Sequence, residues 1–195
     1  MSVLHPDLDL AQRAADGDNA AWREIYTQSR DRLFALLVYH IGNREEAMDV
    51  LQETYLAAVK GLSQYKGTGS LESWLCGIAL RRARDWKRRM LRKFKKTDSM
   101  EDAHPVEEII PQPDPEEKRR LHAALNTLPE RQRSAVLLHE WLGYSFGEIG
   151  EILGISEATA RVHSFRARET LRGLLGEDSV GKMKSDAISE ETGLL

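Results

Sequence analysis

The chain of 195 residues contains a single cysteine, Cys76, which excludes an internal disulfide and a cysteine-based zinc site. No run reaches the ~18 apolar residues that a membrane-spanning helix needs, and residues 1–10 lack the pattern of a secretory signal peptide. The histidines lack metal-ligand spacing, and the sequence has no glycine-rich phosphate loop and no nucleophile beside a base. We therefore expect a cytoplasmic protein without membrane insertion, cofactor or enzymatic activity.

An excess of positive charge is also missing, since the net charge is −3, but the charges are strongly segregated. Residues 81–96 hold ten Lys or Arg and one acid, whereas residues 97–117 hold eight acids and neither Lys nor Arg. Four of the six prolines fall in this acidic stretch, where they disfavour helix and sheet. The cationic block beside an anionic one points to a nucleic-acid partner more clearly than the net charge does.

Apolar residues recur at three- and four-residue spacings and no run alternates with period two, which predicts an all-α fold. We expect two small helical domains, at residues 8–96 and 116–176, joined by an acidic linker at 97–115 and followed by a disordered polar tail at 177–195. The expected helices span residues 8–15, 20–41, 44–60, 71–92, 116–125, 129–141, 146–153 and 157–174. Asp18 and Ser70 suit helix N-caps.

The sharpest local motif lies at residues 145–159 and predicts a helix-turn-helix. Ser145 and Glu148 form a capping box, Gly154 permits a tight turn, and Ser156 can cap the second helix. Helical spacing places one set of its residues toward the core: Ala160, Ala167, Leu171 and Leu174. The outward set is Ala158, Arg161, Val162, Phe165 and Arg166, which mixes cations with apolar groups and suits a DNA major groove. The alternative is a plain helical hairpin with a solvated basic face.

The helix expected at residues 44–60 has two different faces. One face carries the apolar residues of a core, whereas the other carries Asp49, Gln52, Glu53 and Leu56. An apolar residue ringed by polar and acidic groups suits a protein interface, because burial supplies affinity and charge supplies orientation. The alternative is a tolerated surface leucine.

The helix expected at residues 71–92 carries a row of cations, Arg81, Arg84 and Arg88, about one turn apart, with Gly77 one turn before it. Such a row matches a run of phosphates, and Gly77 would allow close approach of a ligand backbone. Tyr65 and Lys66 lie in the preceding loop, and an aromatic beside cations suits unstacked bases. A solvated, highly charged helix end that binds nucleic acid nonspecifically is the alternative.

Together these residues resemble the extracytoplasmic-function (ECF) group of bacterial RNA polymerase sigma factors, over residues 18–175. Residues 49–56 (DVLQETYL) resemble the core-polymerase-binding segment of region 2, and residues 73–79 (SWLCGIA) resemble the stretch leading into its promoter-contacting helix. Residues 125–133 (LNTLPERQR), followed by 143–149 (GYSFGEI), resemble the opening of region 4.

The resemblance implies partners for each surface. Asp49, Gln52, Glu53 and Leu56 would bind the coiled coil of the largest polymerase subunit, and the C-terminal domain would contact the flap region. Promoter DNA at the minus-ten element would be engaged and melted by Tyr65, Lys66, Ser70, Arg81, Arg84 and Arg88. The minus-thirty-five element would be read by Ser156, Glu157, Ala158, Thr159, Arg161, Val162, Phe165 and Arg166. An anti-sigma factor is a further expected partner, and catalysis would belong to the polymerase.

The reading helix departs from the family pattern. Members usually carry Gly-Thr-Val-Lys-Ser-Arg at its start, whereas residues 158–163 here are ATARVH. Val162 and His163 therefore put the usual DNA contacts at these two positions in question. A helix-turn-helix regulator that never touches polymerase is the alternative function, although it would not need the surface around Leu56 or the single-strand features of the first domain.

Overall fold

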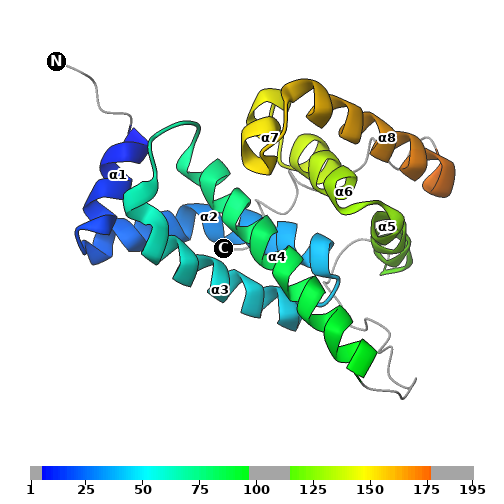
Figure 1. Cartoon of the computed structure of the whole chain (residues 1–195), viewed down its shortest axis with the longest axis horizontal. Helices are drawn as coiled ribbons and strands as arrows, with labels where there is room; N and C mark the ends of the chain where they lie inside the picture. Colours follow the sequence, from blue (N-terminus) through cyan, green and yellow to red (C-terminus); the bar gives the residue numbers. More distant parts are fainter. Residues whose placement is uncertain (1–5, 97–114, 177–195) are drawn as a thin grey trace. The chain divides into compact units, whose positions relative to one another are not determined.

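The computed structural model describes residues 6–96 and 115–176, and every regular element in these residues is helical. The chain divides into two compact units, with the boundary between Glu107 and Glu108. The expected all-α fold with two helical domains is confirmed (Figure 1). The predicted linker at 97–115 and the tail at 177–195 lie outside the described residues, apart from Pro115, which begins a helix.

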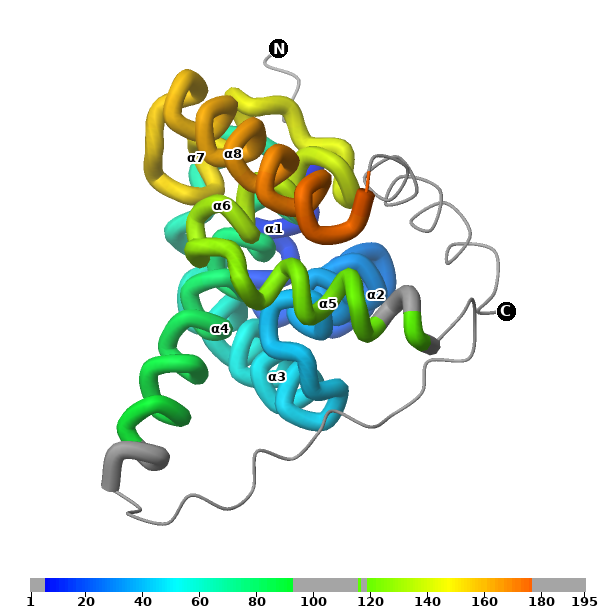
Figure 2. The backbone as a smooth tube through the Cα atoms, turned by 90° about the vertical axis from the view of Figure 1, so that its right-hand side faces the viewer, coloured from blue at the N-terminus to red at the C-terminus, as the bar shows by residue number. Residues whose placement is uncertain are grey.

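The N-terminal unit contains five elements: α1 (Pro6–Ala15), α2 (Asn19–Ile41), α3 (Arg44–Gly61), the short 3-10 helix η1 (Leu62–Gln64) and α4 (Leu71–Lys96). Helices α2, α3 and α4 pack pairwise against one another, as Figures 1 and 2 both show. Helix α1 packs on α2 and also contacts η1 and α4. The single cysteine, Cys76, is fully buried in α4, where it acts as a packing residue.

Local chemistry explains where these helices begin and end. The Asp18 carboxylate accepts hydrogen bonds from the backbone N–H groups of Ala20 and Ala21, at 2.8 and 3.3 Å, and so caps α2. Gly42 ends α2 with a φ of +85°, a left-handed conformation that favours glycine. Asn43 then caps α3 by accepting from Glu46 N at 3.0 Å. The cap expected at Asp18 is therefore confirmed.

The C-terminal unit also contains five elements: α5 (Pro115–Thr127), α6 (Glu130–Val136), the π-helical turn η2 (Leu137–Trp141), α7 (Phe146–Leu153) and α8 (Glu157–Leu175). The single helix expected at residues 129–141 is wrong in two details. Pro129 lies before the helix as its N-cap residue, and the last turn is π-helical. The π turn is accompanied by a buried Glu140, whose carboxylate lies 3.5 Å from the Arg168 guanidinium of α8.

The core of the C-terminal unit lies between α6 and α8, with α5 and α7 also packed on α8. Ala160, Ala167 and Leu171 are buried as expected, but Leu174 is 50% exposed, so the inward face of α8 ends one turn earlier than predicted. The core also holds Arg133, only 2% exposed, whose guanidinium donates to the carbonyl oxygens of Asn126 and Leu128 at 3.1 and 3.4 Å. Burial lowers the pKa of this guanidinium. Arg133 thus ties the connection between α5 and α6 to the core.

Candidate protein- and nucleic-acid-binding surfaces

The polar face of α3 presents an isolated leucine to solvent. Leu56 is 64% exposed, and Asp49 and Gln52 are exposed on the same side of the helix, with Glu53 half-buried. The opposite side supplies buried residues to the core: Ala47, Val50, Leu51, Thr54 and Ala58. The helix therefore separates its two faces as the sequence indicates, and α3 offers an acid-rimmed apolar surface.

A second exposed apolar residue extends this surface along α3, and an exposed tyrosine of α2 packs against the same helix. Val59 is exposed one turn after Leu56, and Tyr26 of α2 is exposed with its ring centroid 5.0 Å from that of Tyr55 on α3. Burial raises the pKa of the Tyr55 hydroxyl to about 12, against a weaker opposing effect of its 2.8 Å hydrogen bond to Ser29. The contribution of α2 could not be seen in sequence, because it depends on how α2 and α3 pack.

Glu53 is engaged by the cationic helix beside it. Its carboxylate lies 2.9 Å from the Arg89 guanidinium of α4, and Glu46 accepts a 2.6 Å hydrogen bond from the Trp86 indole. Both contacts join α3 to α4 across 36 and 40 residues of sequence. Asp49 thus carries more of the available negative charge of the surface than Glu53 does.

The cation row of α4 is only partly presented to solvent. Arg81 and Arg88 are exposed, whereas Arg84 between them is half-buried. Partial shielding of the Arg81 guanidinium from water is the largest cause of its lowered pKa, followed by repulsion from Arg84 and Arg82. Gly77 is buried and offers no open surface, so the expectation that a ligand approaches the backbone there is wrong.

The loop before α4 is built around Tyr65. The Tyr65 side chain is 6% exposed, its hydroxyl donates to the Gly69 carbonyl at 2.8 Å, and its ring lies 5.8 Å from that of Trp74. Its expected role in stacking on a base is therefore corrected, because the ring is committed to supporting the loop. Lys66 remains exposed, and Ser70 caps α4 by accepting from Ser73 N at 3.1 Å, as expected.

The helix-turn-helix of α7 and α8 follows the sequence closely. Ser145 accepts from Glu148 N at 3.3 Å while the Glu148 carboxylate accepts from Ser145 N at 2.8 Å, which completes the capping box. Gly154 closes α7 at a φ of +65°. Ser156 caps α8 by accepting from Thr159 N at 3.2 Å, and its hydroxyl lies 2.7 Å from that of Thr159.

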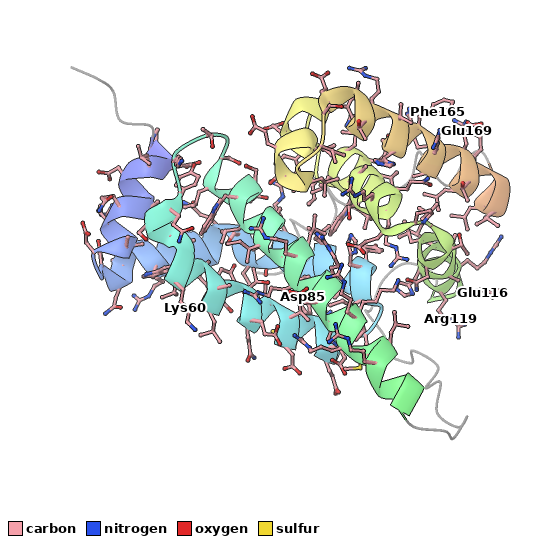
Figure 3. The ribbon with its side chains drawn as sticks, viewed as in Figure 1. Lys60, Asp85, Glu116, Arg119, Phe165 and Glu169 are labelled. Atoms are coloured by element: carbon pink, nitrogen blue, oxygen red, sulfur yellow. The ribbon has the colours of Figure 1, made fainter. Side chains whose placement is uncertain are left out.

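The outward face of α8 mixes apolar and charged groups as expected. Val162 and Phe165 are exposed, Phe165 by 55%, and Figure 3 shows Phe165 on the side of α8 that faces away from α6. The other exposed residues of this face are Ser156, Glu157, Ala158, Arg161 and Arg166, with Thr159 half-buried among them. Seven of the eight residues predicted to read DNA are therefore exposed, and they lie between the N-cap and the middle of α8.

Arg161 is held against its own domain by two contacts. Its guanidinium donates to Glu157 at 2.9 Å and lies 4.8 Å from the centroid of the Phe146 ring. Phe146 in turn stacks on His139 at 4.1 Å. An exposed ion pair of this kind contributes little to stability, so a phosphate can displace Glu157.

His163 is half-buried on α8, and its pKa is lowered, first by burial and then by Arg131 and Arg166. The imidazole is therefore neutral near pH 7, unlike the arginine that the family pattern carries there.

Among the described residues, no group of three His, Cys, Asp or Glu side chains could hold a metal ion. None of the helices described is long and apolar enough to cross a membrane.

Two family models match the chain. The model described as Sigma-70 region 2 matches residues 25–93, and the model described as Sigma-70, region 4 matches residues 118–171. The first match contains most of α2 with α3 and most of α4, and the second contains the helix-turn-helix.

Two curated relatives match over most of their own length. The chain is 32% identical over 166 residues to the RNA polymerase sigma factor CarQ of Myxococcus xanthus, which covers 85% of this chain and 95% of that protein. It is 30% identical over 175 residues to the ECF RNA polymerase sigma factor SigM of Mycobacterium tuberculosis, covering 90% and 87% of the two chains.

Solved structures share the fold at lower identity. The sigma factor RpoE, in complex with the anti-sigma factor NepR from Bartonella quintana, is similar with a TM-score of 0.69 at 22% identity, covering 80% of this chain and 98% of that one. CnrH, in complex with the cytosolic domain of CnrY, gives a TM-score of 0.67 at 23% identity, covering 87% and 96%.

Proposed function

Because this chain belongs to the ECF group of sigma-70 RNA polymerase sigma factors, which direct transcription initiation, we propose that α3 binds core polymerase while α4 and α8 contact a two-part promoter. The observation that carries the proposal is the pair of unlike exposed faces, an acid-rimmed leucine on α3 and an apolar and basic face on α8. One chain with both faces can join a protein to DNA.

The core-binding surface consists of Asp49, Gln52, Glu53 and Leu56, which we assign to the coiled coil of the largest polymerase subunit. Leu56 is the expected anchor, because burying an exposed leucine within a polar rim supplies affinity without requiring a large area. Asp49 supplies orientation toward a basic partner. Val59 adds exposed apolar area one helical turn after the anchor.

The minus-ten surface consists of Lys66, Ser70, Arg81, Arg84 and Arg88. The cations of α4 would contact phosphates, while the exposed loop residues Lys66, Thr68 and Gly69 would hold a base that has left the stack. Tyr65 contributes from below by fixing the loop through Gly69. The loop at residues 65–70 has no exposed aromatic side chain, since Tyr65 is buried. We therefore assign capture of the base to backbone groups and polar side chains of the loop.

The minus-thirty-five surface is the start of α8, placed in the major groove. Arg166 and Arg161 are the cations of this face, and Val162 with Phe165 offers apolar contact to thymine methyl groups. The C-terminal unit would also contact the polymerase flap. We assign the two sigma regions to residues 8–96 and 116–176, and we expect an anti-sigma protein to cover the DNA-binding surfaces. The similar sigma factor RpoE forms a complex with the anti-sigma factor NepR, which supports a partner of this class.

The core-binding assignment is tested by co-purification with core polymerase. Replacing Asp49→Ala together with Leu56→Ala should weaken core binding roughly thirtyfold or more while leaving helicity intact. The matched control removes one exposed carboxylate and one exposed leucine elsewhere, Asp16→Ala with Leu174→Ala, and should bind as the unchanged chain does. Equal binding by both double variants would refute the assignment of α3.

The promoter assignment is tested by runoff transcription with core polymerase on a library of genomic fragments, which also identifies a promoter. On that promoter, Arg161→Ala should weaken duplex binding upstream, and Arg84→Ala should chiefly slow opening near the start site. Arg172→Ala, at the far end of α8, is the control for removal of an exposed cation. Equal effects of Arg161→Ala and Arg84→Ala on both steps would contradict this division.

A further inference from the structure

The first helix, α1, lies outside the residues that the region 2 family model matches, yet it contacts the loop before α4. The Asp7 carboxylate accepts a hydrogen bond from the backbone N–H of Leu71 at 2.8 Å, across 64 residues of sequence. The next residue, Leu8, reaches Gly67, since a Cβ on this glycine would lie 3.5 Å from the Leu8 side chain. Helix α1 thus touches both the middle and the end of the loop.

The contact between Asp7 and Leu71 performs a task that a nearby residue normally performs. The first N–H groups of a helix have no partner within the helix, and Leu71 is the first residue of α4. Ser70 satisfies one such group, that of Ser73, whereas the carboxylate from α1 satisfies that of Leu71. A carboxylate is also favoured at a helix N-terminus by the helix dipole. The start of α4 is therefore fixed from a separate helix.

The loop is fixed from its inner side as well. Tyr65 holds Gly69 through its hydroxyl, and Gly67, with a φ of +70°, adopts a left-handed conformation beneath Leu8. Between these anchors Lys66, Thr68 and Gly69 remain exposed. The loop is thus held at three points while its outer edge stays open.

We propose that α1 is a positioning element for promoter opening, in which Asp7 and Leu8 hold the loop at residues 65–70 in the shape that accepts a melted base. Helix α1 does not contact the base itself. It acts by holding the loop in place before DNA binds, which lowers the entropic cost of ordering the loop. The inference rests on the proposed role of this loop at the minus-ten element. It adds a function to a segment that the family model does not include.

The test compares three variants of the full chain with core polymerase on the promoter found by runoff transcription. Asp7→Ala removes the acceptor, Asp7→Asn keeps an oxygen that accepts from Leu71 N, and Asp9→Ala removes an exposed carboxylate from the same helix. Asp7→Ala should slow promoter opening about three- to tenfold, the loss expected for one hydrogen bond. Asp9→Ala should open the promoter at the unchanged rate. Asp7→Asn should open it at nearly that rate, because Asn keeps the hydrogen bond and loses only the weaker attraction of the carboxylate to the helix dipole.

The readouts separate this role from general support of the fold. Core binding and duplex binding at the minus-thirty-five element should be the same in all variants, and amide exchange at residues 66–71 should rise only in Asp7→Ala. Leu8→Ala, which shortens the side chain at the separate contact between α1 and Gly67, should also slow the opening step. Equal opening by Asp7→Ala and Asp7→Asn, or an equal loss of core binding and opening in Asp7→Ala, would overturn the proposal. Failure of the unchanged chain to initiate transcription would instead refute the proposed function.

Discussion

We predict that Gly150→Ala destabilises the C-terminal unit, because the turn between α7 and α8 leaves no room for a side chain at this position. A Cβ on Gly150 would lie 2.8 Å from the carbonyl oxygen of Ile155 and 3.3 Å from the backbone nitrogen of Glu157. Both atoms belong to backbone, so no side-chain rotation can relieve the overlap. The same turn is closed by the hydrogen bond from Ile155 N to Gly150 O at 2.9 Å, which resists separation of the two helices.

The size of the effect follows from two opposing contributions. Replacing a glycine inside a helix with alanine normally stabilises it by up to about 1 kcal/mol. Forcing an extra carbon into a closed site costs about 1–3 kcal/mol, and contact with backbone places Gly150→Ala at the upper end. We therefore expect a net loss of about 2 kcal/mol in the free energy of unfolding of the C-terminal unit, roughly a thirtyfold change in its folding equilibrium.

Urea-dependent amide exchange at residues 116–176 measures this loss in the full chain. Gly147→Ala is the matched control in the same helix, since its Cβ would meet only side-chain atoms of Ser145 and Glu157, at 3.9 and 4.0 Å. The control should be as stable as the unchanged chain or slightly more stable. If Gly150→Ala were as stable as Gly147→Ala, the turn would have slack and the argument from close backbone approach would be wrong.

Three further predictions concern polar groups that are buried or half-buried. Arg133→Met should lower the free energy of unfolding by about 1–3 kcal/mol in urea titration, because two loop carbonyls lose their donor; a more stable variant would mean that desolvation of the guanidinium dominates. The pKa of Tyr55 is raised to about 12, so the folded chain keeps a proton that the unfolded chain loses above pH 10. Stability should therefore fall between pH 10 and 12, by about 1–2 kcal/mol after allowance for partial exposure, and Tyr55→Phe should remove this dependence. Burial lowers the pKa of His122 and His163, so the stability they contribute is present above their ordinary pKa and lost as pH falls through the folded value; Tm measured from pH 7.5 to pH 5 should decline less in the double His→Gln variant.

The sequence predicted best those features that short-range chemistry decides. The bounds of α7 are those expected, because Ser145, Glu148 and Gly154 specify its two ends within ten residues. The exposure of Leu56 also followed from helical spacing alone.

Features that depend on packing between distant segments were not predicted. The burial of Tyr65 depends on Trp74 and Gly69, and spacing in the sequence does not reveal that the ring turns inward. The ion pair of Glu53 with Arg89 likewise arises from the crossing of α3 and α4. The role of Asp7 at the start of α4 is the extreme case, since no local signal links the two residues.

The π turn at Leu137–Trp141 makes the chain length in this segment critical. A π turn accommodates one more residue than an α turn, and this turn brings Glu140 to the buried position opposite Arg168. Deleting one residue here would let the helix close as a regular α-helix, without the wide turn that places Glu140 opposite Arg168. Adding a residue to a turn that already holds an extra one would instead rotate the start of α7 by about 100°, so its capping box would begin on the wrong side of the domain.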